Sequence, residues 1–146
     1  HVRKPAINGY HGELERTFFV GHPNEKAKRA FSAMVEAQMT VLDAIRPGVT
    51  GGEMDALARK VLNKYGYGEY AIHRVGHGQG LGRHEEPFLI YDSNLVLEEN
   101  MVFTVEPGIY IPDVGGFRHS DTLIITKDGY ENTTPFKRLP EELTFA

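Results

Sequence analysis

Apolar side chains recur at helical spacing in two stretches of the N-terminal half, and turn residues end each stretch. The first runs from Asn24 to the Pro-Gly pair at 47–48, which predicts one long amphipathic helix. Thr50 is followed three residues later by Glu53, a spacing typical of a capping box. We therefore expect a second helix that begins at Thr50 and stops near Gly66.

Shorter apolar segments bounded by turn residues predict strands. They cover residues 15–20, 70–75, 88–91, 101–106 and 122–126. Two helices followed by several antiparallel-looking strands indicate an α+β fold. No internal repeat, low-complexity stretch or linker divides the sequence, so we treat residues 1–146 as a single domain.

The composition limits the classes of function. With 146 residues, 40% hydrophobic and 25% charged, the sequence is long enough to build one globular core. A net charge of −4 argues against nucleic acid or an anionic membrane as the main partner. No apolar run approaches the roughly 20 residues that span a bilayer. The absence of cysteine excludes disulfides and thiolate metal sites, and it fits a cytoplasmic protein.

Residues 73–84 carry the densest candidate chemistry: His73, His77 and His84, together with four glycines. Imidazoles bind metal ions or transfer protons near neutral pH, and glycine lets backbone and substrate approach closely. A single histidine in a glycine-rich turn can also serve only to cap backbone groups. Three histidines at this spacing favour a functional site.

Two further segments add charged groups. In Glu106-Pro107-Gly108 a carboxylate ends a predicted strand just before a turn, where it either faces a cleft or is a solvated acid at a loop edge. Residues 116–122 read Gly-Phe-Arg-His-Ser-Asp-Thr. Within this segment, Arg118 and Asp121 form either a structural ion pair or part of a site.

In this order and at these distances, the three segments resemble the second half of the pita-bread hydrolases. That superfamily includes Xaa-Pro aminopeptidases, prolidases, methionine aminopeptidases and the metal-free creatinases, and the resemblance covers residues 9–133. It implies a pita-bread fold of which this chain holds the C-terminal half of the catalytic domain, with the upstream half and an N-terminal domain outside it. It also implies a homodimer that acts on a small molecule or a dipeptide.

The metallopeptidases of this superfamily bind two divalent ions with two Asp, one His and two Glu, because carboxylates must offset the charge of both ions. The resemblance assigns His77 and Glu106 to this set and places Glu13 where the second Asp is expected. The other two positions are occupied by Val2 and Ser120, and neither supplies an anionic ligand.

The neighbours of Ser120 do not supply the missing anionic ligand. His119 and Asp121 flank it, but adjacent side chains of a strand point to opposite faces. We therefore expect either no metal or one weakly bound divalent ion, Mn, Co or Zn.

The same departures resemble the creatinase branch. Segment 14–17, Leu-Glu-Arg-Thr, is similar to a creatinase segment whose acid, here Glu15, binds the substrate's guanidinium group or its activated water. Creatinase also has an Arg-x-x-Asp element like Arg118 to Asp121, with an acid where this chain has His119. Imidazoles and carboxylates without a full metal set can hydrolyse a C–N bond by general acid–base catalysis.

Together these comparisons define a candidate site. The expected catalytic residues are His73, His84, Glu15, Glu106 and His119, with His77 and Arg118 binding the substrate. Three functions remain open. The first is a C–N hydrolase without a complete binuclear metal site. The second is a metal-dependent Xaa-Pro dipeptidase or aminopeptidase, and the third is a pita-bread domain that binds peptides or proteins without catalysis.

Overall fold

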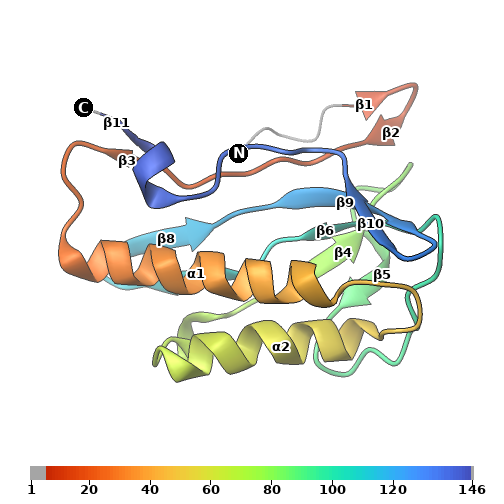
Figure 1. The fold of residues 1–146 in the computed structure, drawn as a ribbon, viewed down its shortest axis with the longest axis horizontal. Helices are drawn as coiled ribbons and strands as arrows, with labels where there is room; N and C mark the ends of the chain where they lie inside the picture. The colour runs from red at the N-terminus through yellow and green to blue at the C-terminus, as the bar shows by residue number, and fades with distance from the viewer. Residues whose placement is uncertain (1–5, 146) are drawn as a thin grey trace.

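Two helices pack against an antiparallel sheet in the computed structural model, which describes residues 6–145 (Figure 1). Helix α1 spans Glu25–Ala44 and helix α2 spans Gly51–Lys64. The two helices lie side by side along the same face of the sheet (Figure 1). Both helices therefore form where the sequence predicts them.

Local side-chain contacts explain why each helix begins where it does. The Asn24 side chain accepts a hydrogen bond from the backbone N–H of Ala27, and it caps α1. Thr50 and Glu53 form the predicted reciprocal capping box at the start of α2. These caps satisfy N–H groups that have no partner within the helix.

The main sheet has five strands in the order β10, β9, β6, β4, β5, and all neighbours are antiparallel. The strands are β10 (Gly129–Asn132), β9 (Asp121–Thr126), β6 (Val102–Val105), β4 (Gly76–Gly78) and β5 (Glu85–Leu89). The strands expected at 101–106 and 122–126 are confirmed, and the one expected at 88–91 is shifted toward the N-terminus. The predicted α+β class is confirmed.

The prediction of a strand at residues 70–75 is wrong. A short 3-10 helix, η1 (Gly68–Tyr70), stands at its start, and the strand begins only at Gly76. Strand β4 lies so close to β6 that a Cβ atom on Gly76 would be 2.0 Å from the carbonyl oxygen of Thr104. The close approach requires glycine, and glycine gives no strand signal in a hydrophobic pattern.

Three small ladders complete the fold. Strand β1 (Ala6–Ile7) pairs antiparallel with β2 (Tyr10–His11). Strand β3 (Phe19–Val20) pairs parallel with β11 (Thr144–Phe145). Strand β7 (Gly108–Ile111) pairs antiparallel with β8 (Gly115–Arg118). A second 3-10 helix, η2 (Pro140–Glu142), precedes β11. The strand expected at 15–20 forms only in part, because Glu15 makes an isolated bridge to Ser120 and β3 begins at Phe19. This bridge brings the N-terminal segment to the start of β9.

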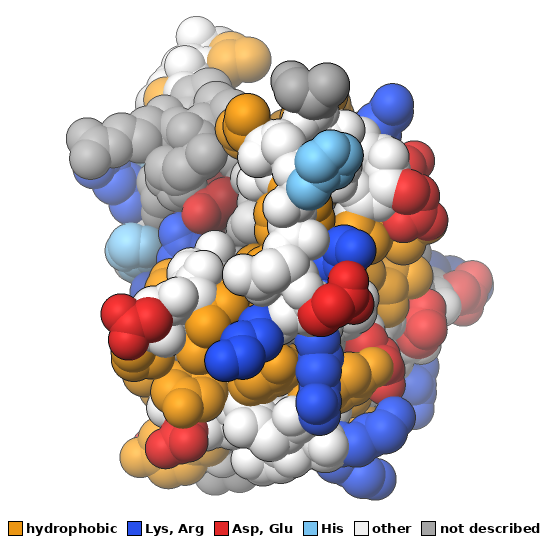
Figure 2. All heavy atoms as spheres, turned by 90° about the vertical axis from the view of Figure 1, so that its left-hand side faces the viewer, with side chains coloured by type: hydrophobic (Ala, Val, Ile, Leu, Met, Phe, Trp, Pro, Cys, Tyr) orange, Lys and Arg blue, Asp and Glu red, His pale blue; other side chains and the backbone are white. Residues whose placement is uncertain are grey.

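The hydrophobic core fills the space between the helices and the sheet. Its largest fully buried side chains include Phe31, Met34, Leu42, Met54 and Phe103. Over the described part of the chain, no helix has the length and apolar character needed to cross a membrane. Figure 2 looks onto the end of the molecule where α1 begins and shows basic and acidic side chains interspersed with exposed hydrophobic ones. Neither sign of charge dominates that face.

Candidate functional site

A pocket of about 340 Å³ collects side chains from four separate parts of the chain. Its lining residues are Glu13, His73, Arg74, His77, His84, Glu106 and Arg118. Six of these seven are residues that the sequence singled out, and Arg74 is the addition. The other two predicted residues, Glu15 and His119, do not line the pocket, and they lie in different parts of the structure.

Glu13, His77 and Glu106 form a buried group in which one ligand atom from each lies within 4.8 Å of the others. His77 Nδ1 is 2.9 Å from the carbonyl oxygen of Gly78, which can only accept, so we assign the hydrogen to Nδ1. Nε2 then faces Glu106 Oε1 at 3.0 Å. Nε2 has no hydrogen-bond partner among the described residues, as expected of a nitrogen arranged to bind a cation.

Glu106 stands at the end of β6, where its backbone N–H donates to the carbonyl oxygen of Val75 at 2.6 Å. Burial by itself would raise the pKa of the Glu106 carboxyl. The adjacent His77 ring, with the positive charge of Arg118, outweighs burial and holds that pKa below its ordinary value. Glu106 is therefore a carboxylate at neutral pH, as a cation ligand or a general base must be.

His73 has both ring nitrogens engaged. Its Nδ1 donates to the carbonyl oxygen of Arg74 at 2.6 Å, and its Nε2 accepts from the Tyr110 hydroxyl at 3.0 Å. Burial raises the pKa of Tyr110, which keeps that hydroxyl protonated. A Cβ atom at Gly108 would lie 2.7 Å from His73 Nε2, so glycine makes room for the ring. The pattern of apolar residues gave no indication of Tyr110, because its role depends on the β7–β8 hairpin.

His84 lies in the loop between β4 and β5 and is exposed at the pocket. Its ring stands almost perpendicular to that of His77, with the ring centroids 4.2 Å apart. The glycine-rich segment thus brings the second and third predicted histidines together. His84 is placed where a substrate group in the pocket could exchange a proton with it.

Arg118 pairs with Glu15 and not with Asp121. Its Nη2 lies 2.6 Å from Glu15 Oε2, and its Nε donates to the same oxygen at 2.8 Å. The same Nε is 3.8 Å from Glu106 Oε2. The interpretation of Arg118 and Asp121 as a structural ion pair is therefore wrong. Glu15 is connected to the pocket through its ion pair with Arg118.

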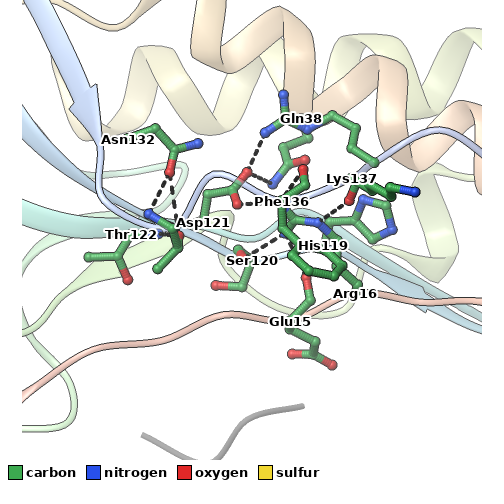
Figure 3. A network of polar contacts seen from close by, with 12 residues as sticks. Glu15, Arg16, Gln38, His119, Ser120, Asp121, Thr122, Asn132, Phe136 and Lys137 are labelled. Atoms are coloured by element: carbon green, nitrogen blue, oxygen red, sulfur yellow. Dashed lines mark hydrogen bonds and ion pairs between the residues drawn. The ribbon is translucent and has the colours of Figure 1, made fainter. Parts of the chain in front are cut away.

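Ser120 and its neighbours alternate as predicted for an extended chain. The Ser120 hydroxyl donates to Glu13 Oε1 at 3.0 Å, on the pocket side. Asp121 points the other way, toward Gln38 of α1 and toward Arg16, while Glu15 points away from that helix (Figure 3). Asp121 therefore does not take the place of the missing carboxylate. The other position with a missing ligand, Val2, lies outside the described residues.

His119 lies on the helix side of the chain and not in the pocket. It is fully buried, its ring packs edge-on against Phe31 with centroids 5.1 Å apart, and its Nε2 is 3.4 Å from the carbonyl oxygen of Thr17. The structure therefore does not bring His119 to the other expected catalytic residues, because side chains alternate along this segment.

The environment of His119 predicts a pH dependence of stability. Burial, with the positive charge of Arg16, lowers the pKa of His119 to about 3. The unfolded chain, with an ordinary histidine pKa of about 6.5, takes up the proton first, so stability falls as the pH drops from about 6.5 toward 3. Between pH 7 and 5 we expect the free energy of unfolding to fall by about 2 kcal/mol because of His119, a loss that His119→Gln does not show. Urea unfolding at both pH values measures it, and equal losses in both proteins would contradict it.

Comparisons with known proteins agree with this geometry. Residues 4–127 match the profile of metallopeptidase family M24. The sequence is 45% identical over 131 residues to an Xaa-Pro dipeptidase of Pyrococcus furiosus, a match that covers 90% of this chain and 38% of that protein. The crystal structure of dipeptidase PepE from Mycobacterium ulcerans superimposes with a TM-score of 0.89 at 38% identity, over 93% of this chain and 36% of that one.

A more distant likeness concerns the fold alone. The N-terminal domain of the FACT complex subunit SPT16 from chickpea superimposes with a TM-score of 0.87 at 20% identity, over 94% of this chain and 35% of that one. The predicted pita-bread fold is confirmed by these matches. The chain spans less than two fifths of the length of each of these relatives.

Proposed function

Because the chain belongs to metallopeptidase family M24, we propose that its pocket hydrolyses a C–N bond with one divalent ion in place of two. The observation that carries this proposal is the buried group of Glu13, His77 and Glu106. An Xaa-Pro dipeptide is the proposed substrate, because a relative named for that activity shares 45% identity with this chain.

The donor set fits one ion better than two. Two carboxylates and one neutral imidazole suit Mn²⁺, Co²⁺ or Zn²⁺. Ser120 stands where a further carboxylate would be needed, and its hydroxyl instead donates to Glu13 and fixes that side chain. Without that carboxylate a second ion would lack the charge that offsets it, since bridging carboxylates hold such pairs.

The pocket residues have distinct roles in this proposal. When bound, the divalent ion supplies Lewis-acid polarisation of the scissile carbonyl. Glu106, kept ionised by His77 and Arg118, takes a proton from the water that attacks the carbonyl carbon. His84 gives a proton to the leaving nitrogen as the C–N bond breaks, and His73 holds the pocket wall through Tyr110.

Removal and return of the metal tests this function. Hydrolysis of alanyl-proline should be lost after dialysis against a chelator and restored by Mn²⁺, Co²⁺ or Zn²⁺. His77→Gln should prevent the restoration, while His22→Gln, the same exchange at an exposed position, should not. Turnover that resists chelation would refute the role of the ion. No turnover under any condition would refute hydrolysis and would favour a peptide-binding domain.

A further inference from the structure

Arg74 is the pocket residue for which the proposed mechanism has no role. Its guanidinium lies over the ring of Phe88, 5.2 Å from the ring centroid. Phe88 is the β5 residue directly opposite His77 in the β4–β5 ladder, and opposite residues share one face of a sheet. The Arg74–Phe88 stack therefore belongs to the same wall of the pocket as His77.

Stacking leaves the hydrogen-bonding capacity of Arg74 largely unused. The donors of a guanidinium lie in its plane, so a ring against its face does not block them. The Nε atom is enclosed and has no hydrogen-bond partner in the described part of the chain. Phe88 thus holds the guanidinium without offering it an acceptor oxygen, and the two Nη groups of Arg74 remain for another acceptor.

The charges around the pocket leave Arg74 uncompensated. The other lining arginine, Arg118, is paired with Glu15 at 2.6 Å. Glu13 and Glu106 belong to the candidate ion-binding group. Within residues 6–145 no carboxylate forms an ion pair with Arg74. It is therefore the positive charge at this site that can receive an anionic group from outside the protein.

The backbone that carries Arg74 is fixed before any ligand arrives. Arg59, held by a buried Asp55 of α2, donates to the carbonyl oxygens of Ala71 and His73 at 3.0 and 3.2 Å. On the other side of Arg74, the N–H of Val75 donates to Leu89 of β5 at 2.9 Å. A binding group that is already ordered loses little entropy when it binds.

From these contacts we infer that Arg74 is the anion-recognition group of the pocket and selects substrates that carry a free carboxylate. The planar fork of arginine matches the two oxygens of a carboxylate, and such charge-assisted pairs are stronger than neutral hydrogen bonds. In the proposed peptidase function, which this inference presupposes, the carboxylate is the C-terminus of a dipeptide. The inference adds a determinant of specificity, and the residues proposed for bond cleavage are unchanged.

The test compares alanyl-proline with its C-terminal amide, two ligands that differ in one negative charge. Binding to the protein, measured by calorimetry, should be roughly 10- to 100-fold tighter for the acid. Arg74→Gln removes the charge and keeps a polar side chain, and it should weaken acid binding by a similar factor and leave amide binding within about twofold. Arg46→Gln removes an exposed arginine outside this pocket, and it should change neither affinity.

Two further variants separate charge from geometry. Arg74→Lys keeps the charge but loses the planar fork, so it should recover only part of the preference for the acid. Phe88→Leu keeps an apolar contact but loses the ring, and it should reduce the preference roughly two- to fivefold. Thermal unfolding of each variant shows whether it is folded.

The outcomes distinguish this inference from the proposed function. Tighter binding of the acid that depends on Arg74, without turnover of either ligand, would support the inference and refute hydrolysis. Turnover with equal binding of acid and amide would refute the inference and leave hydrolysis intact. Equal losses for both ligands in Arg74→Gln, or no binding of either to the wild-type protein, would also overturn it.

Discussion

Glu106→Gln is expected to lower hydrolysis of alanyl-proline by roughly 10²- to 10⁴-fold. The amide keeps the shape of the side chain but removes the negative charge that faces His77 Nε2 at 3.0 Å. It also removes the group that takes the proton from water. We therefore expect loss of metal affinity together with loss of turnover, and both can be measured on one sample.

The control for this variant is Glu99→Gln, the same chemical change at an exposed position. It should leave turnover and metal binding unchanged. If Glu106→Gln retained more than about a tenth of the wild-type rate, Glu106 would not have the role proposed for it.

Asp121→Asn is expected to destabilise the fold by about 3–5 kcal/mol, the usual cost of breaking a buried ion pair. Asp121 is fully buried and is shared by Arg16 and by Gln38 at 3.2 Å (Figure 3). Arg138 also contacts it, at 2.6 Å. Arg16 also donates to the carbonyl oxygens of Ser120 and Lys137, so it ties the C-terminal loop to the segment that carries Glu13. Loss of the carboxylate would leave two arginines without their buried partner.

Urea and thermal unfolding measure this effect, and the melting temperature should fall by on the order of 10 °C. Asp128→Asn, at an exposed turn, is the matched control and should change stability by less than about 0.5 kcal/mol. A loss below about 1 kcal/mol in Asp121→Asn would show that the network contributes little.

Features fixed by short-range interactions could be predicted from the sequence. Both helices begin at residues whose side chains cap the next few N–H groups. The sequence showed Asn24 as the start of the first helix, and it showed the Thr50–Glu53 spacing as a capping box. The alternation around Ser120 followed from the geometry of an extended chain, and the structure confirms that Asp121 faces away from Glu13.

Features that depend on contacts between distant segments could not be predicted. Strand β4 was missed because the close packing of Gly76 against Thr104 excludes a side chain. Tyr110 has a partner in the pocket wall only because the β7–β8 hairpin folds back to His73. His119 was expected beside the other histidines, but its side chain points to α1 instead of the pocket.

Most residues that line the pocket could be predicted from the glycine-rich segment, because they are close in sequence as well as in space. His73, His77 and His84 all line it. Arg74 lies in the same segment, but an arginine in a sequence is usually a solvated surface charge. Only the stack on Phe88 and the pairing of Arg118 with Glu15 distinguish it from one.

The number of divalent ions bound per chain tests the central claim most directly. The protein would be purified without chelator and titrated with Mn²⁺, Co²⁺ or Zn²⁺ while bound metal and hydrolysis of alanyl-proline are followed together. The account predicts one ion per chain, lost in His77→Gln, with hydrolysis rising in step with occupancy. Two ions per chain, or full hydrolysis with none bound, would contradict it.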